Sequence, residues 1–445
     1  MRSLVLAASA WALLLAPSWA QQTAAMPSFE TEVMAAGYKA LMVCGAVHNA
    51  RANGVERTLD SVQANELVGI YPGLDGVVRD LPVRVTADGV TVPAEGHRPE
   101  RRAVYVAGRG CAILPVGGSS RHPGSEPLAR RVDAPEWRVG QPRGDDAALR
   151  RALTRARNGS LGEGGNTTAL VVVQDGRIVG EWYKVGFGPD TPQRTWSVAK
   201  SLAGTFVGWR VLEDRLAPNA PLNMGGHDHD PRNAITLDHF LRMSSGLTSD
   251  TAGNRTDGIY FGGALVSDAQ AWPLIAAPGS RYRYANNDIL LAVLATRPRT
   301  EADEPNALFD QMGMSHTVAE TDWQGRYVLS SQVWSTARDL ARFGQFYLDG
   351  GVAEGRRLIP EDWPAYVSRP SGPQPGGAQG YGATFWLMNR SEGVPPDTIS
   401  ANGNRGQYVV IVPSRNIVIV RRGEDPAGAG FDHIALTREV LAALD

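Results

Sequence analysis

Strand-like segments stand at the two ends of residues 144–445, and a long helical and loop-rich stretch separates them. Residues 168–183 (TALVVVQDGRIVGEWY) predict two strands joined at Asp175-Gly176, a dipeptide typical of hairpin turns. Hydrophobic periodicity predicts helices at 146–157, 197–216 and 434–444. It also predicts two more strands at 407–412 and 416–421. Strands so far apart in sequence bury their apolar faces by joining one sheet, so we expect an α/β fold with a helical domain inserted into the sheet.

The composition is that of a globular chain and argues against several classes of partner. Hydrophobic residues make up 43% of the 445 residues and charged residues 20%, which is enough apolar material for a full core. The formal net charge is -2, whereas nucleic acids and anionic membrane surfaces favour a basic excess. We therefore expect no nucleic-acid partner. The chain also lacks a Gly-x-x-x-x-Gly-Lys-Ser/Thr segment, so nucleotide chemistry has no support.

The first twenty residues have the pattern of a signal peptide. Arg2 precedes an apolar run at 4–16, and small residues near Ala20 fit a signal-peptidase site before Gln21. The alternative is an anchor that stays attached, although the run is short for a span of roughly 20 residues. No later segment is apolar enough to cross a bilayer. Residues 1–20 therefore predict a mature chain that has no membrane span and is periplasmic or secreted.

Residues 21–116 form a predicted N-terminal accessory module, and residues 117–143, rich in Gly, Ser, Pro and Arg, form a predicted linker to residues 144–445. Within the module, the patterns predict a helix at 56–67, a hairpin at 81–92 and a strand at 103–114. The module holds both cysteines of the chain, Cys44 and Cys111. In an oxidising compartment they could pair and close a long loop; two unpaired buried thiols are the alternative.

The segment 196–201 (WSVAKS) opens an apolar helix and places Ser197 and Lys200 three residues apart, on one helix face. A serine becomes nucleophilic when a neighbouring base takes its proton, and a neutral lysine can do this. The helix dipole and burial both disfavour the charged ammonium at this position. Only three of the 44 Lys and Arg residues are lysines, and arginine cannot replace lysine where a proton must be removed. The structural alternative is a helix start with a solvated lysine.

Two later segments supply groups that suit the same chemistry. Residues 282–287 (YRYANN) contain Tyr284 and Asn286 and precede an apolar helical run, and a phenol beside a lysine can shuttle a proton between nucleophile and leaving group. Residues 401–407 (ANGNRGQ) stand at the head of a strand, where backbone N–H groups can face an oxyanion. The structural alternatives are a core aromatic side chain at Tyr284 and an ordinary turn at 402–404.

At these residues the chain resembles the serine β-lactamase and penicillin-binding superfamily. The branch it resembles is the class C-type serine hydrolases, which include family VIII carboxylesterases and 6-aminohexanoate-dimer hydrolases. Residues 241–247 (LRMSSGL) and 335–344 (STARDLARFG) support the resemblance, and residues 406–413 (GQYVVIVP) are similar to the 6-aminohexanoate-dimer hydrolase branch. The resemblance covers about 144–445. It implies a β-lactamase/transpeptidase-like fold, in which an antiparallel sheet is flanked by helices and carries an inserted helical domain.

The resemblance also implies a role for each candidate residue. The implied catalytic residues are Ser197, Lys200 and Tyr284, and the implied substrate-binding residues are Asn286, Gly403 and Asn404. Ser197 would be acylated, with Lys200 as its base partner and Tyr284 as the phenol that relays the proton. Asn286 would contact the amide on the acyl side of the substrate. The backbone N–H groups of Ser197 and Asn404 would form the oxyanion hole.

The implied reaction needs no cofactor. A His-Asp-His-Asp run at 227–230 offers ligand types that suit zinc, but no third cluster follows at a standard spacing. We therefore expect this run to be a solvated loop and predict no metal site.

The third motif departs from the superfamily. β-Lactamases and DD-peptidases usually carry Lys-Ser/Thr-Gly, whose lysine helps to hold the substrate carboxylate, whereas this chain has Ala401-Asn402-Gly403. Arg405 could replace that charge. The departure favours a small-molecule ester or amide substrate over β-lactams and cell-wall peptides. One alternative is a β-lactamase or DD-peptidase, and another is a penicillin-binding sensor that is acylated without turnover.

Overall fold

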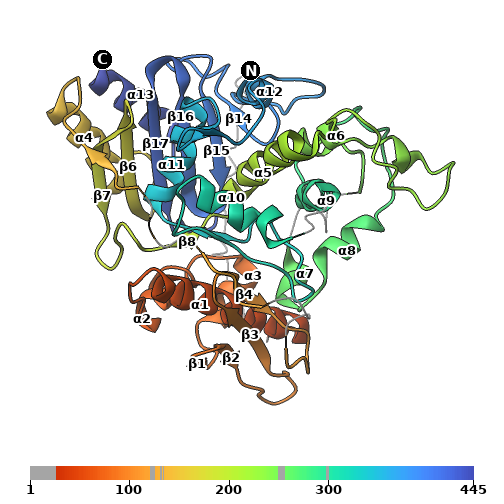
Figure 1. Cartoon of the computed structure of the whole chain (residues 1–445). Coiled ribbons are helices and arrows are strands. Elements are labelled where there is room, and N and C mark those ends of the chain that lie inside the picture. Colours follow the sequence, from red (N-terminus) through yellow and green to blue (C-terminus); the bar gives the residue numbers. More distant parts are fainter. Residues whose placement is uncertain (1–26, 121–125, 131–132, 134, 249–255, 297–299) are drawn as a thin grey trace, which may run out of the picture.

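The computed structural model describes residues 27–445 apart from 121–125, 131–132, 134, 249–255 and 297–299 (Figure 1). The predicted signal peptide lies outside the described residues. The strands of the main sheet are β5 (Arg138–Val139), β6 (Thr167–Gln174), β7 (Arg177–Tyr183), β13 (Gly380–Tyr381), β14 (Trp386–Leu387), β15 (Ile399–Gly403), β16 (Gln407–Val412) and β17 (Ile417–Gly423). Their order in the sheet is β13-β14-β15-β16-β17-β6-β7-β5.

Strands from the two ends of residues 144–445 meet in the middle of this sheet. β17 pairs with β6 in antiparallel register, with Val418 opposite Val173. Every neighbouring pair within the described part of this sheet is antiparallel except β5 and β7, which are parallel. The sequence prediction of a sheet that joins the two ends of this segment is confirmed. The predicted linker contains β5 and so contributes an edge strand.

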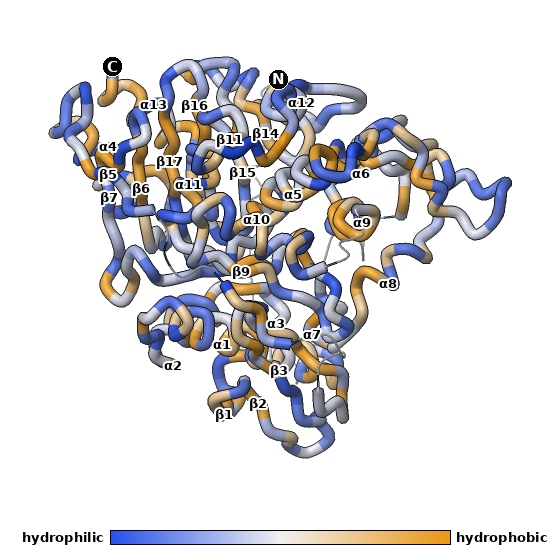
Figure 2. Tube along the Cα trace, viewed as in Figure 1, coloured by the Kyte–Doolittle hydropathy of each residue, from blue (hydrophilic) through white to orange (hydrophobic). Residues whose placement is uncertain are grey.

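Helices cover both faces of the sheet, because its central strands are apolar on both sides. The covering helices are α4 (Asp146–Arg157), α5 (Val198–Asp214), α11 (Ala337–Leu348) and α13 (His433–Leu444). Leu170 and Val172 pack in one core cluster with residues of α4 and α13. Val171 and Val173, which alternate with them along β6, pack in another cluster with residues of α5 and α11. Figure 2 shows hydrophobic residues along β6 and β17 as well as in helix α9.

A helical region lies between α5 and α11, as the sequence predicted. Its helices are α6 (Leu237–Leu241), α7 (Asp257–Tyr260), α8 (Leu265–Gln270), α9 (Asn286–Thr296) and α10 (Pro305–Gln311). α9 packs against α5, α6 and α8, beside the main sheet (Figure 1). The remaining elements are β8 (Gln193–Arg194), β9 (Val318–Ala319), β10 (Val333–Ser335), β11 (Val352–Ala353), β12 (Arg356–Arg357) and α12 (Trp363–Ser368).

The N-terminal module has its own antiparallel sheet, in the order β1-β2-β3-β4. Its elements are α1 (Phe29–Ala52), α2 (Leu59–Ala64), α3 (Pro72–Val78), β1 (Arg84–Thr86), β2 (Gly89–Val92), β3 (Arg101–Val106) and β4 (Gly110–Ile113). β1 and β2 confirm the predicted hairpin. The prediction of a single strand at 103–114 is wrong. Gly108 and Gly110 adopt positive φ angles of 75° and 67°, so the chain turns there and returns as a second strand.

Helix α1 was not predicted, because it is buried on all sides and shows no amphipathic period. Its residues from Ala35 to Ala50 are all buried. They share one hydrophobic cluster with residues from beyond the linker, among them Trp196, Tyr260 and Trp334. The module therefore packs against the rest of the chain through this shared cluster. Figure 1 shows the module in the lower part of the view. None of the helices that the structure describes is long and apolar enough to cross a membrane.

Cys44 and Cys111 form a disulfide that joins α1 to β4. The paired alternative left open by the sequence is therefore the one observed. The two residues are 67 positions apart, so the bond closes a long loop of the unfolded chain.

Replacing both cysteines by alanine should lower the free energy of unfolding by about 4 kcal/mol, because the unfolded chain regains the entropy of this loop. Urea unfolding followed by circular dichroism measures the loss. Either single replacement breaks the same bond and should give a loss of similar size, whereas an unchanged unfolding midpoint would contradict a stabilising disulfide.

Candidate active site

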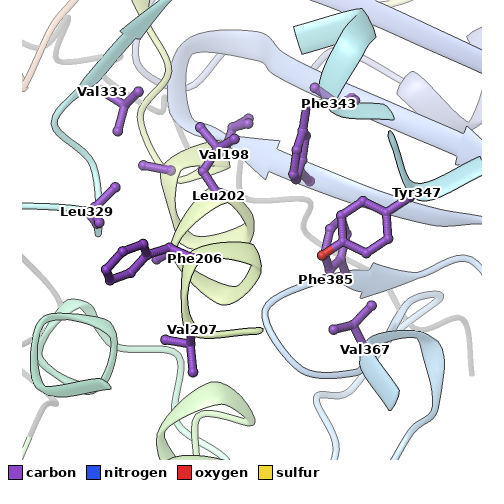
Figure 3. Packing of buried hydrophobic residues seen from close by; sticks show 14 of the residues in the cluster. Val198, Leu202, Phe206, Val207, Leu329, Val333, Phe343, Tyr347, Val367 and Phe385 are labelled. Carbon is purple, nitrogen blue, oxygen red and sulfur yellow. The ribbon is translucent and has the colours of Figure 1, made fainter. Parts of the chain in front are cut away.

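The turn before α5 places Ser197 at the first position of a buried helix. The backbone N–H of Thr195 donates to the Val333 carbonyl, which fixes the strand that leads into the turn. Trp196 adopts a left-handed φ of 51°, and Ser197 follows as the N-cap residue of α5. Figure 3 shows side chains of α5 and of the elements around it filling the core on both sides of the helix. The nucleophile candidate therefore stands on a rigid element.

Lys200 is buried, with its amino group against Ser197. Its Nζ lies 2.9 Å from Ser197 Oγ, 2.6 Å from Asn286 Oδ1 and 2.8 Å from the Ser330 carbonyl oxygen. The side chain is 1% exposed, so the alternative of a solvated lysine does not hold. Burial, together with the nearby charge of Arg194, lowers the pKa of Lys200 to about 7. A large share of the molecules thus carries a neutral amine near pH 7, as a general base requires.

Tyr284 lies on the other side of the same pair of groups. The Nζ of Lys200 is 4.8 Å from the centroid of its ring, and the nearby Ser197 side chain acts to lower the pKa of the phenol. Burial raises the pKa of Tyr284 above the ordinary value of a phenol. Tyr284 is therefore a protonated phenol at neutral pH, beside an amine of lowered pKa. Opposite shifts in neighbouring groups separate an acid from a base.

Asn286 opens α9 and binds Lys200 through its side-chain oxygen, as the distance above shows. A second contact joins α9 to the predicted motif at 241–247. The Ser245 hydroxyl donates to Asp288 Oδ1 at 2.7 Å. Burial raises the pKa of Asp288 to about 7, and the hydrogen bonds from Ser245 partly oppose this shift. The motif thus holds the helix start that carries Asn286. Its contact with a substrate amide stays a prediction.

The segment at 401–407 lies beside the Ser197 turn. A Cβ atom on Gly403 would lie 2.5 Å from the Thr195 carbonyl oxygen and 3.2 Å from the Ser197 nitrogen, so only glycine fits this approach. Asn404 follows at the turn between β15 and β16 and is exposed. The turn at 402–404 therefore adjoins the Ser197 turn, and its role in binding an oxyanion stays a prediction.

The suggestion that Arg405 supplies a charge for substrate is wrong. Its guanidinium donates to Glu424 Oε2 at 2.9 Å and to the backbone carbonyls of Asn65 and Gly69 at 2.7 and 2.9 Å. The side chain is 5% exposed and turns into the N-terminal module. Sequence could not reveal this, because the two carbonyls lie more than 300 residues earlier in the chain.

Tyr284 is surrounded by an aromatic cluster that the sequence motifs do not predict. The ring of Tyr284 packs 6.0 Å from that of Tyr381 and 5.6 Å from that of Trp386, and Tyr282 packs 5.5 Å from Tyr381. Tyr381 and Trp386 pair across β13 and β14, far from any motif. The cluster makes the surroundings of Tyr284 apolar, which is the physical cause of its raised pKa.

Residues 227–230 form a turn in which the Asp230 carboxylate pairs with Arg232 at 2.6 Å. In the part of the chain that the structure describes, no group of three or more His, Cys, Asp or Glu side chains could hold a metal ion.

Comparison with known proteins identifies the family. Residues 160–438 match the model of the Beta-lactamase family. This chain belongs to the beta-lactamase family. It is 26% identical over 308 residues to a 6-aminohexanoate-dimer hydrolase of Paenarthrobacter ureafaciens, an alignment that covers 58% of this chain and 73% of the relative. The family and this relative make it a serine hydrolase.

Solved structures agree in fold. A candidate 6-aminohexanoate-dimer hydrolase from Bacillus anthracis superposes with a TM-score of 0.54 at 20% identity, over 69% of this chain and 87% of that one. A class C beta-lactamase in complex with cefoxitin superposes with a TM-score of 0.50 at 13% identity, over 67% of this chain and 98% of that one. The β-lactamase/transpeptidase-like fold expected from the resemblance is therefore confirmed.

The pH dependence of kcat/KM should follow Lys200. Below pH 7 the amine is protonated and cannot accept the Ser197 proton, so activity on an ester should fall about tenfold per pH unit and level off above pH 7. Stopped or continuous assays between pH 5 and 9 give the profile. Asp288→Asn is the matched control, since the pKa of Asp288 is also raised to about 7. A midpoint that disappears in this variant would assign the titration to Asp288.

Tyr284→Phe should slow turnover on the order of 10²-fold, because the proton relay to the leaving group is lost while the ring remains. Steady-state kinetics on the purified variant measures the change. Tyr282→Phe is the matched control, because the Tyr282 hydroxyl has no hydrogen-bond partner among the described residues. Equal turnover rates in the two variants would show that the Tyr284 hydroxyl takes no part in proton transfer and that Tyr284 only packs in the core.

Proposed function

We propose that the chain is an exported serine hydrolase that cleaves ester or amide bonds through an acyl-serine intermediate, as 6-aminohexanoate-dimer hydrolases and family VIII esterases would. The observation that carries the proposal is the 2.9 Å contact between Ser197 Oγ and the Nζ of a fully buried lysine. Burying an amine so that its pKa falls costs folding free energy. Use of Lys200 as a general base explains why the chain keeps a buried lysine at this position.

In the first half-reaction, Ser197 Oγ attacks the substrate carbonyl carbon and its proton passes to the neutral amine of Lys200. The carbonyl oxygen becomes an oxyanion that the backbone N–H groups of Ser197 and Asn404 stabilise. The bond to the leaving alcohol or amine then breaks, and the leaving group takes a proton through Tyr284. The product of this step is an ester of Ser197 with the acyl group.

In the second half-reaction, water attacks the acyl carbon of that ester. The same groups, Tyr284 and Lys200, accept the proton of the water and return one to Ser197 Oγ as the acyl–oxygen bond breaks. A carboxylic acid leaves and the free enzyme is restored. The raised pKa of Tyr284 suits a proton donor and the lowered pKa of Lys200 suits an acceptor, so the pair divides the two roles.

The third motif supports esters and amides over β-lactams. Ala401 stands where the superfamily usually has a lysine, and Arg405 is engaged by Glu424 and the N-terminal module. Neither residue offers a positive charge to a substrate carboxylate. The similarity to the Paenarthrobacter ureafaciens hydrolase points in the same direction. A linear dimer of 6-aminohexanoate and short-chain esters are therefore the first substrates to examine.

The disulfide supports export. Disulfides persist in oxidising compartments such as the periplasm and are rare in the cytosol. A chain that carries the pair Cys44–Cys111 therefore fits cleavage of residues 1–20 and a mature protein that starts near Gln21.

The test uses protein purified from the periplasm, whose N-terminal residue is determined by mass spectrometry. p-Nitrophenyl butyrate and the 6-aminohexanoate dimer are each assayed with the wild type, Ser197→Ala and Lys200→Arg. We expect turnover only in the wild type, because arginine keeps the positive charge but cannot lose a proton. Turnover by Lys200→Arg would remove the lysine from the mechanism. An inert wild type that forms a stable penicillin adduct on Ser197 would favour a cell-wall enzyme or a sensor instead.

A further inference from the structure

We infer that residues 65–71 of the N-terminal module are positioning residues that hold both halves of the oxyanion hole. The inference rests on the proposed function, since it concerns the backbone N–H groups of Ser197 and Asn404. Residues 65–71 lie outside residues 160–438, which match the family model, so the support is a feature of this chain. The residues that flank these donors in the sequence are Trp196 and Arg405.

Both flanking residues have an uncommon backbone conformation. Trp196 has a φ of 51° and Arg405 a φ of 57°, in the left-handed region that non-glycine residues rarely occupy. Such a conformation persists only where the surroundings enforce it, and it clusters at functional sites. The N–H of Ser197 belongs to the peptide that follows Trp196, and Asn404 immediately precedes Arg405. Trp196 thus helps directly to set the direction of the Ser197 donor, whereas Arg405 acts on the Asn404 donor by holding the short turn that contains both residues.

The side chain of Arg405 is held by the start and the middle of the segment. It donates to the carbonyl oxygen of Asn65 at 2.7 Å and to that of Gly69 at 2.9 Å. Glu424 accepts a third hydrogen bond at 2.9 Å and balances the charge of the guanidinium. Arginine suits this position because its planar fork reaches three acceptors at once, which the ammonium of lysine cannot do in one geometry.

The side chain of Trp196 is held by the end of the same segment. The ring of Tyr71 meets the Trp196 ring edge-on, with centroids 6.2 Å apart and an interplanar angle of 82°. The guanidinium of Arg194 stacks on the Trp196 ring at 3.9 Å from its centroid. Trp196 is 6% exposed and belongs to the hydrophobic cluster built around α1. Its indole is therefore held by the module on one side and by Arg194 of β8 on another.

The segment is itself locked to the end of the main sheet. Gly69 has a φ of 62°, and a Cβ atom there would lie 2.4 Å from Pro426 Cβ, so the turn presses against the residues that follow β17. The Gly69 carbonyl also accepts a hydrogen bond from the Ala427 N–H at 2.6 Å. One short turn therefore contacts the nucleophile loop, the oxyanion loop and the sheet at the same time. Loss of the contacts made by residues 65–71 should therefore disturb the relative positions of the Ser197 and Asn404 N–H groups.

The test compares Tyr71→Leu and Arg405→Lys with the wild type, one variant for each half of the hole. Tyr71 is only partly buried, and leucine keeps apolar volume there, so this variant should fold. The readouts are kcat and KM for p-nitrophenyl butyrate and the inhibition constant of butylboronic acid, which forms a tetrahedral adduct on a reactive serine. We expect kcat to fall about 10- to 100-fold and the boronic acid to bind more weakly by a similar factor, with KM within about threefold of the wild type.

Ile113→Val is the matched control for stability. Ile113 is fully buried in the core of the module and lies on β4, outside residues 65–71, so the Ile113→Val replacement should lower the unfolding temperature and leave kcat unchanged. Folded Tyr71→Leu and Arg405→Lys proteins with kcat and boronic-acid affinity like those of the control would overturn the inference. A wild type whose ester turnover survives Ser197→Ala would instead overturn the proposed function, and the inference with it.

Discussion

The buried amino group of Lys200 is the constraint on which the rest of the site depends. An ammonium in the core is costly unless each of its hydrogens has an acceptor, and here Ser197, Asn286 and Ser330 supply the three. The three acceptors come from α5, α9 and the loop before β10. Satisfying one amine therefore brings three distant parts of the chain together. Even so, these hydrogen bonds do not fully offset the cost of removing the ammonium from water, and the pKa of Lys200 falls to about 7.

The main sheet supplies the rigidity that this arrangement needs. β6 and β17 pair side by side although they come from opposite ends of the family-matched region, and α5 is packed against the strands beside them. Because α5 lies in the core on both sides, Ser197 and Lys200 cannot separate without opening a cavity. The aromatic cluster then packs around the third group, Tyr284. The fold thus places a phenol beside an amine, and the pKa values of these two groups have moved in opposite directions.

The N-terminal module is built into the same core. Helix α1 shares a hydrophobic cluster with Trp196 and Trp334, and buried Glu320 joins the two parts by accepting from Asn49, from the Cys111 N–H and from the indole of Trp334. A carboxylate buried in this way needs all of its donors, so neither part is complete without the other. The module therefore contributes to the structure around the nucleophile turn.

Elements with a local pattern can be predicted from the sequence alone. The strands around Asp175-Gly176, helix α4 and strand β16 follow from hydrophobic period and turn residues, and Ser197 and Lys200 share a face because helix geometry requires it. Helix α1 and the direction of Arg405 could not be predicted in this way. A helix buried on every side has no periodic pattern, and the acceptors of Arg405 are distant carbonyls that any residue could provide. Both depend on the packing of segments that are distant in the sequence, because long-range packing rather than residue type selects such contacts.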